Sequence, residues 1–222
     1  MKKTKGILSW SGGKDSALAY HECMLSQKYK ILGLLTTVTK DYDRISMQGV
    51  RRELVQMQAS EMNLPVYEVL IPKNASNEIY ESQLGRQLSM LKRNGVSTVL
   101  FGDLFLQDIR LYRERLGEKF GIMSGFPVWG RDTKALAEHF VDQGFKAIVC
   151  CLDPKRLGKE FCGREFDQKF LSEIPKEVDP CGENGEFHTF VYDGPIFKEK
   201  LRIKAGKVVE RDGYFFADIL PS

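Results

Sequence analysis

The chain has 222 residues, of which 42% are hydrophobic, and its 33 basic and 30 acidic side chains leave a net charge of +3. This length suits one large domain, or a domain with a smaller lobe. The even charge balance, without a basic arm or stripe, argues against a dedicated nucleic-acid binder, and no apolar run reaches the length of a membrane span. We therefore expect neither a nucleic-acid partner nor a membrane partner.

The cysteines form no recognisable metal or disulfide pattern. Their number is odd, no pair has C-x-x-C spacing, and two of them are sequence neighbours. Together with an N-terminal apolar run that is too short for a signal peptide, this predicts a cytoplasmic protein. The five positions are Cys23, Cys150, Cys151, Cys162 and Cys181.

Over the first two-thirds of the chain, short β-rich segments alternate with helical patterns. This alternation predicts an α/β fold in which a parallel sheet carries helices on both faces. Strands are expected at residues 6–10, 31–38, 66–71, 97–101 and 146–152. Helices are expected at residues 14–27, 48–63, 76–92, 108–119 and 133–142.

The pattern changes after about Pro154, where glycine, proline and charged residues become dense. The tail has β character, with strands expected at residues 187–192, 201–204 and 208–211 and a hairpin turn at Ala205-Gly206. We place the division between an N-terminal domain, residues 1–130, and a smaller C-terminal α+β lobe, residues 131–222.

The hexapeptide S-G-G-K-D-S, residues 11–16, lies between the first strand and the first helix. Gly12 and Gly13 allow an anion to approach the backbone N–H groups, and the start of the helix adds its positive dipole end. Lys14 supplies a cation, while Asp15 can cap the helix or help to hold Mg²⁺. A capped strand-to-helix turn is the plain alternative, but the complete strand–loop–helix context favours a phosphate site.

A second concentration of polar groups lies at residues 179–195. It brings acidic residues, an asparagine and a histidine into a loop that leads into a strand, including Glu183, Asn184, Glu186 and His188. Such density suggests a functional loop. A solvated acidic turn explains the composition equally well, and a single histidine is more often structural than catalytic.

S-G-G-K-D-S resembles the PP-loop of N-type ATP pyrophosphatases. The resemblance implies a HUP-type, Rossmann-like sheet and an ATP cleaved between its α- and β-phosphates. It also implies that the adenine lies over the end of the second strand, near Thr36 and Thr37. Threonines in a strand are also explained by β-propensity alone.

The wider pattern is similar to the diphthine–ammonia ligase family of PP-loop ATPases. It consists of the loop, F-G-D-L-F-L at 101–106, R-x-Y-R-E at 110–114, P-x-W at 127–129 and G-E-N-G-E-F-H-T-F-V-Y-D-G-P at 182–195. The resemblance covers nearly the whole chain. It implies that ATP, with Mg²⁺, activates a carboxylate as an acyl-adenylate, and that ammonia then displaces AMP to form an amide.

This resemblance assigns expected roles to individual residues. The expected catalytic residues are Lys14, Asp15, Glu183, Glu186 and His188. The expected ATP-binding residues are Ser11, Gly12, Gly13, Lys14, Asp15, Ser16, Thr36, Thr37, Gly102 and Asp103. The expected Mg²⁺ ligands are Asp15 and Asp103. The expected substrate contacts are Asn184, Arg110 and Arg113, although an exposed, salt-bridged helix would explain the two arginines equally well.

Two positions in the acidic loop depart from the usual family pattern. Members that modify the elongation factor usually read G-E-G-G-E-[FY]-E-T, whereas this chain has Asn184 and His188 at the variant positions. The stretch at residues 101–114 looks like the bacterial-type branch. We therefore expect a small or protein-borne carboxylate substrate and ammonia as partners, and a homodimer is possible. A PP-loop sulfur transferase acting on RNA and a nucleotide-binding sensor remain the alternative functions.

Overall fold

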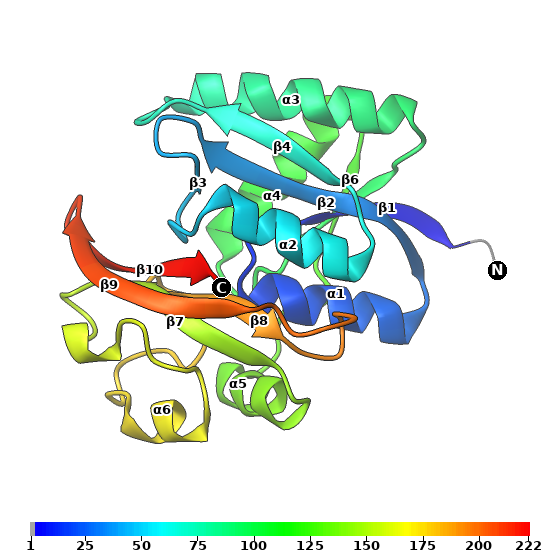
Figure 1. The fold of residues 1–222 in the computed structure, drawn as a ribbon. Helices are drawn as coiled ribbons and strands as arrows, with labels where there is room; N and C mark the ends of the chain where they lie inside the picture. Colours follow the sequence, from blue (N-terminus) through cyan, green and yellow to red (C-terminus); the bar gives the residue numbers. More distant parts are fainter. Residues whose placement is uncertain (1–2) are drawn as a thin grey trace.

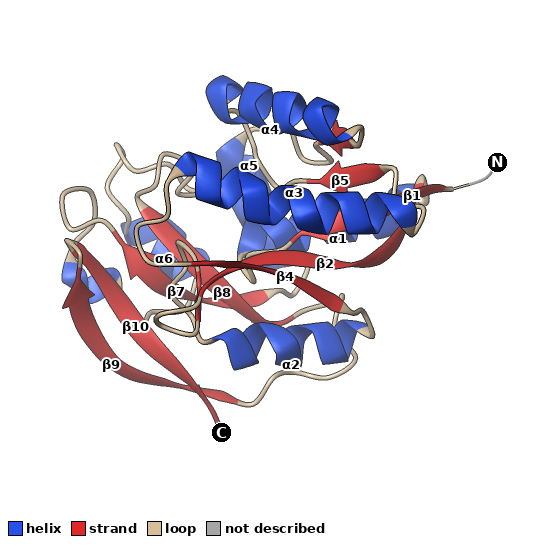
Figure 2. Ribbon diagram, turned by 90° about the horizontal axis from the view of Figure 1, so that it is seen from above, coloured by secondary structure: helices blue, strands red, loops and turns tan. Residues whose placement is uncertain are grey.

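The computed structural model describes residues 3–222, and its larger sheet is built around the central strand β1 (Figures 1 and 2). Four parallel pairings give the order β4-β2-β1-β5-β6, and the short β3 adds an antiparallel pairing to β2. These strands are β1 (Thr4–Ser9), β2 (Tyr29–Thr39), β3 (Arg44–Ile45), β4 (Val66–Ile71), β5 (Thr98–Leu100) and β6 (Met123–Gly125).

Helices cover both faces of this sheet, which confirms the predicted α/β architecture. Successive side chains of a strand point to opposite faces. Accordingly, Ile7 packs in the cluster formed with α3 (Asn77–Arg93) and α4 (Gln107–Phe120). Leu8 packs instead with α1 (Lys14–Ser26) and α2 (Arg52–Met62). Within residues 3–222, no helix is both long and apolar enough to cross a membrane.

The smaller sheet is antiparallel, in the order β8-β7-β10-β9. Its buried phenylalanine cluster includes Phe140, Phe166, Phe170 and Phe187, and it is continuous with the core on the α1 and α2 side of the larger sheet. The two sheets therefore share one core. The remaining elements are α5 (Thr133–Asp142), β7 (Lys146–Leu152), the 3₁₀ turn η1 (Lys159–Phe161), α6 (Gln168–Glu173), β8 (Phe187–Asp193), β9 (Ile203–Arg211) and β10 (Tyr214–Pro221).

The predicted hairpin turn at Ala205-Gly206 is wrong. Both residues lie inside β9, and the chain reverses at Asp212-Gly213. The φ angles of these two residues are 52° and 83°, which is the left-handed geometry that two-residue hairpins require and that Asp-Gly favours. The Asp-Gly pair was therefore the stronger turn signal, and reading it would have exposed β10, which the sequence analysis missed.

Strand β8 forms one edge of the smaller sheet, and its free edge meets the loop that follows β1. Val191 N donates to Gly12 O at 2.9 Å. The fully buried Gln58 of α2 strengthens this junction, because its Nε2 donates to Gly12 O at 3.0 Å and to Val191 O at 2.6 Å. Its Oε1 accepts from Trp10 Nε1 at 2.8 Å. One amide side chain thus joins α2, the end of β1 and β8.

We expect Gln58→Met to lower the free energy of unfolding by about 2–4 kcal/mol, because the substitution leaves the buried Trp10 N–H and a buried carbonyl without a partner. Urea unfolding measures the change. The matched control is Gln56→Met on the exposed side of the same helix, which removes only an exposed hydrogen bond to Glu68 and should cost about 1 kcal/mol or less. Equal losses in the two variants would contradict this role for Gln58.

Candidate functional site

The loop at residues 11–16 is held in shape by its own serines and by two required glycines. Gly12 has a φ of 82°, and a Cβ on Gly13 would lie 2.9 Å from Thr189 O. Ser16 Oγ donates to Gly13 O at 2.8 Å, and Gly13 N donates to Ser11 Oγ at 3.3 Å. The loop is therefore fixed before any ligand binds.

This loop leaves backbone donors open at the start of α1. Within residues 3–222, the N–H groups of Gly12 and Ser16 have no hydrogen-bond acceptor. Gly102, at the end of β5, keeps this region uncovered, because a Cβ there would lie 2.9 Å from Ser16 N. Open N–H groups at a helix start attract anions. The arrangement therefore fits a phosphate group, as the sequence predicts.

Lys14 is almost fully buried and points between the two lobes. Its Nζ donates to both carboxylate oxygens of Asp15, at 2.9 and 3.0 Å, and to Cys181 O. Burial lowers the pKa of Lys14, but the negative groups around it, chiefly Asp15, outweigh this effect and raise the pKa above its ordinary value. Lys14 therefore stays protonated and connects the loop at residues 11–16 to the acidic loop near Cys181.

Glu183 connects the acidic loop to the segment after β5. Its Oε1 accepts a hydrogen bond from Leu104 N at 2.7 Å. Burial raises the pKa of Glu183 to about 7, against the effect of that hydrogen bond, and the charges of Asp15 and Asp103 raise it further. The structure therefore brings Lys14 and three carboxylates together from loops that are far apart in the sequence.

Asp103 faces Arg113, and both groups lack complete hydrogen bonding. Arg113 Nε lies 3.6 Å from Asp103 Oδ2, and both of these buried atoms are without a hydrogen-bond partner. Burial raises the pKa of Asp103, although Arg113 opposes the shift. Arg113 thus lies at the site. Arg110 instead donates to Glu114 at 2.8 Å and packs on two aromatic rings, which favours the salt-bridged helix alternative.

The remaining residues of the acidic loop do not all point toward Lys14. Glu186 is fully buried, and its Oε1 accepts from Asp179 N at 3.2 Å and from the exposed Asn184 at 3.1 Å. These bonds shape the loop. His188 lines a different cavity, beside Cys151, and burial lowers the pKa of its imidazole to about 4.

The two threonines predicted to contact adenine lie at the carboxyl end of β2. Thr36 is buried, and its hydroxyl has no hydrogen-bond partner. Thr37 lines a cavity of about 30 Å³ with Ser9, Phe101 and Arg113. A space of this size matches a water molecule rather than a purine ring. Adenine binding at this position would therefore require the surrounding side chains to move.

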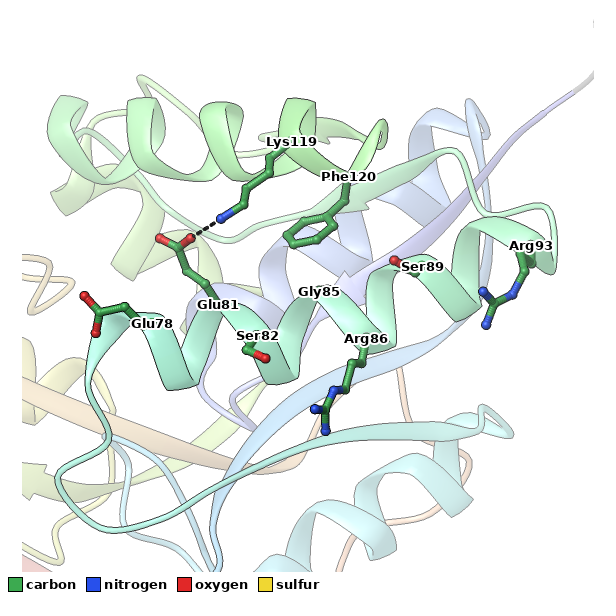
Figure 3. Close-up of a pocket in the computed structure, with 9 residues that line it drawn as sticks. All are labelled: Glu78, Glu81, Ser82, Gly85, Arg86, Ser89, Arg93, Lys119 and Phe120. Carbon is green, nitrogen blue, oxygen red and sulfur yellow. Dashed lines mark hydrogen bonds and ion pairs between the residues drawn. The ribbon is translucent and has the colours of Figure 1, made fainter.

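A surface hollow of about 590 Å³ lies between α3 and α4 and away from the phosphate loop (Figure 3). Phe120 lies over Gly85 at its floor, and Lys119 and Glu81 form an ion pair of 2.7 Å across it. None of the predicted site residues lines this hollow. It is a groove between two surface helices.

Only a few protein side chains could coordinate a magnesium ion at this site. Within residues 3–222, no three His, Cys, Asp or Glu side chains form a group able to hold a metal ion. Mg²⁺ bound with a nucleotide usually takes only one or two carboxylates, together with phosphate oxygens and water. The buried, unpartnered Oδ2 of Asp103 and the nearby Asp15 fit that limited role.

Sequence reasoning missed Gln58, Thr189 and Leu104 as supports of the site. Thr189 Oγ1 accepts from Lys14 N at 3.1 Å, and Leu104 N binds Glu183. Leu104 and Thr189 lie inside the motifs at residues 101–106 and 182–195, but a motif alone does not reveal hydrogen bonds that join distant segments of the chain. Thr189 reaches the loop from the second lobe, whereas Gln58 lies on α2 and Leu104 follows β5.

The raised pKa of Glu183 predicts a pH-dependent stability. Between pH 4.5 and about 7 the folded state keeps a proton that the unfolded state releases, so stability falls as pH rises through this window. Glu183→Gln removes that loss while its side-chain oxygen can still accept from Leu104 N. We therefore expect the variant to gain stability relative to wild type from pH 4.5 to 7 in urea unfolding. If the free energies of unfolding of wild type and Glu183→Gln changed in parallel with pH, the prediction would be contradicted.

Two family models together match nearly the whole chain. One, described as Diphthamide synthase N-terminal domain, matches residues 4–124, and the other, Diphthamide synthase C-terminal domain, matches residues 132–219.

Curated relatives carry the name diphthine–ammonia ligase. The Danio rerio protein is 28% identical over 94% of this chain and 90% of its own length, and the Homo sapiens protein is 24% identical over 94% and 86%. The Schizosaccharomyces pombe protein is also 28% identical over 94% of this chain, but the chain spans only 37% of that longer protein. The predicted family is confirmed: this chain belongs to the diphthamide synthase family.

Proposed function

We propose that this protein is an ATP-dependent ligase that adenylates a substrate carboxylate, releases pyrophosphate and transfers the acyl group to ammonia. The observation that carries this proposal is that the acidic loop contacts the phosphate loop through Lys14 and the segment after β5 through Glu183. A phosphate-binding loop alone would serve many ATP enzymes. The carboxylates from a second lobe beside it supply groups that can handle ammonium and its protons.

In the proposed reaction, the chain's own groups stabilise the leaving pyrophosphate. The open N–H groups of Gly12 and Ser16 and the charge of Lys14 would stabilise the negative charge that develops on the pyrophosphate, and groups held in place before the reaction do this efficiently. Mg²⁺, held by Asp15 and Asp103, would neutralise phosphate oxygens. The N-terminal domain, residues 1–130, would thus bind ATP, and the lobe formed by residues 131–222 would serve the acceptor.

Glu183 is the strongest candidate for proton transfer. A carboxyl group with a pKa of about 7 exists in both protonation states near neutral pH. It can therefore accept a proton as ammonium becomes the nucleophilic ammonia. Glu186 and Asn184 support this loop through their mutual hydrogen bond, and their direct contact with substrate stays a prediction.

The acceptor proposed for this chain is a carboxylate, with diphthine as the first compound to test. The curated relatives are named for joining diphthine and ammonia. However, Asn184 and His188 differ from the usual family pattern in the loop nearest the proposed acceptor. For this reason we propose the same amide-forming reaction for this chain, and an assay has to identify the acid that it uses.

The buried cysteines disfavour the sulfur-transferase alternative. All five are buried, and burial raises the thiol pKa of Cys23 and Cys151 to about 12 and that of Cys162 to about 11. A sulfur carrier needs an accessible thiolate. The sensor alternative leaves the group of carboxylates around Lys14 unexplained.

Product analysis tests the proposed function. The purified protein is incubated with labelled ATP, Mg²⁺, ammonium and a panel of acids that includes diphthine-bearing elongation factor. AMP and pyrophosphate formed in proportion to amide would support the ligase. ADP as product, or a thiolated RNA in the matched sulfur-transfer assay, would overturn it, as would intact ATP with every acceptor.

We expect Lys14→Ala to lower kcat by at least about 100-fold, because a fixed cation is lost from the position of the leaving pyrophosphate. The control is Lys28→Ala, which removes an exposed lysine and should leave kcat unchanged. Circular dichroism and urea unfolding establish that each variant is folded. Normal turnover in folded Lys14→Ala would disprove this mechanism.

We also expect Glu186→Gln to retain ATP binding and lose amide formation. The glutamine can still accept from Asp179 N, so the loop keeps its main contact, but the buried charge is removed. Equilibrium dialysis with ATP measures the first property, and amide yield measures the second. Full amide yield would show that the carboxylate charge of Glu186 is dispensable.

A further inference from the structure

Another cavity, of about 270 Å³, lies between the two lobes. It is located beyond the carboxyl ends of β2 and β7. One wall comes from the turn between β2 and β3, and the other comes from the β9–β10 hairpin. Figure 1 shows β3 and the β9–β10 hairpin on the same side of the molecule. Its lining includes Thr39, Tyr42, Arg44, His188, Arg211 and Phe216.

Arg211 is the distinctive group of this cavity. Its guanidinium carbon lies 4.7 Å from the ring centre of Tyr42 and 4.5 Å from that of Phe216. Within residues 3–222, no carboxylate forms an ion pair with it, and none of its N–H groups makes a side-chain hydrogen bond. The guanidinium packs over both rings, which restricts its movement, and its N–H donors stay available for a bidentate anion.

The other charged groups at the cavity have ion-pair partners. Arg44 donates to Asp218 at 3.0 Å, and Asp212 lies 3.6 Å from Lys73 Nζ. His188 is uncharged near neutral pH, because burial lowers its pKa to about 4. Within the described residues Arg211 has no ion-pair partner, and Asp218 is shared between Arg44 and Arg51, so the charge around the cavity favours an anionic ligand.

Strand β8 links the cavity to the phosphate loop, with one of two successive side chains on each side of the strand. His188 on the cavity wall is followed by Thr189, whose hydroxyl accepts from Lys14 N. Thr39 on the opposite wall ends β2, the strand beside β1. Ligands of open α/β sheets bind at the carboxyl ends of the strands. The cavity and the phosphate loop share that edge of the sheet.

We propose that this cavity is the acceptor site and that Arg211 binds the carboxylate of a small organic acid or acidic side chain there. Its volume is at the low end of small-molecule pockets, so the bound part of the acceptor is modest in size. The assignment as acceptor site rests on the proposed ligase function. The binding of a carboxylate at Arg211 does not.

Histidine NMR can test the binding step directly, because the chain has only three histidines. Glutarate serves as the probe, and uncharged glutaramide, which has the same carbon skeleton, is its matched control. We expect glutarate to shift the ring signals of His188 saturably, while those of His21 and His139, outside the cavity, stay unchanged. Glutaramide should shift none of them.

Variants identify the residue responsible. Arg211→Gln should weaken glutarate binding by at least about tenfold, because it removes a charge-assisted bidentate contact. Arg211→Lys keeps the charge without the planar fork and should lose part of the affinity, which also guards against a folding defect in the first variant. Arg86→Gln, an exposed position on α3, should bind glutarate as the wild type does.

Several results would overturn the proposal. They are an unchanged His188 signal at saturating glutarate, an equal response to glutaramide, full affinity in folded Arg211→Gln, and tighter binding of inorganic phosphate than of glutarate. The ligase proposal fails separately. If glutarate binds through Arg211 but no acid yields AMP, the anion site stands and the ligase function falls.

Discussion

The docking of the free edge of β8 on the phosphate loop is the constraint on which the rest of the site depends. Val191 N donates to Gly12 O, and Thr189 Oγ1 accepts from Lys14 N. Gln58 of α2 donates to carbonyl groups of both the loop and β8. Each partner is a backbone group or a buried side chain, so the contact tolerates little displacement. It places a loop of the second lobe beside the start of α1, where neither lobe alone would gather the carboxylates around Lys14.

That junction also explains the electrostatics of the site. Lys14 remains charged although it is buried, because Asp15 and other negative groups surround it. The same burial disfavours ionisation of Glu183. One buried cation thus coexists with a carboxyl group near its titration midpoint, and the difference arises from contacts supplied by separate segments of the chain. This combination suits a reaction that needs both a fixed positive charge and a mobile proton.

Much of the fold and half of the site follow from local sequence. The strand–loop–helix at residues 11–16 was predictable because a six-residue motif and two flanking elements determine it. The contacts of Lys14 with Thr189 and of Gln58 with Val191 join residues 175 and 133 positions apart, and no local pattern encodes them. The Arg211 stack was equally hidden, because the turn that positions it was placed at Ala205-Gly206 instead of Asp212-Gly213.

The continuous core beneath both sheets has a consequence for how nucleotide reaches its site. Separating the lobes as rigid bodies would expose this core and break the hydrogen bonds of Gln58. Displacing the short segment around Glu183 would break the bond to Leu104 N, the contact between Lys14 and Cys181 and the bond from Cys181 Sγ to Thr133 O. It would also withdraw buried Cys181 from the same core. The fold therefore holds the acidic loop and the phosphate loop together, and a nucleotide would enter a site whose backbone is already assembled.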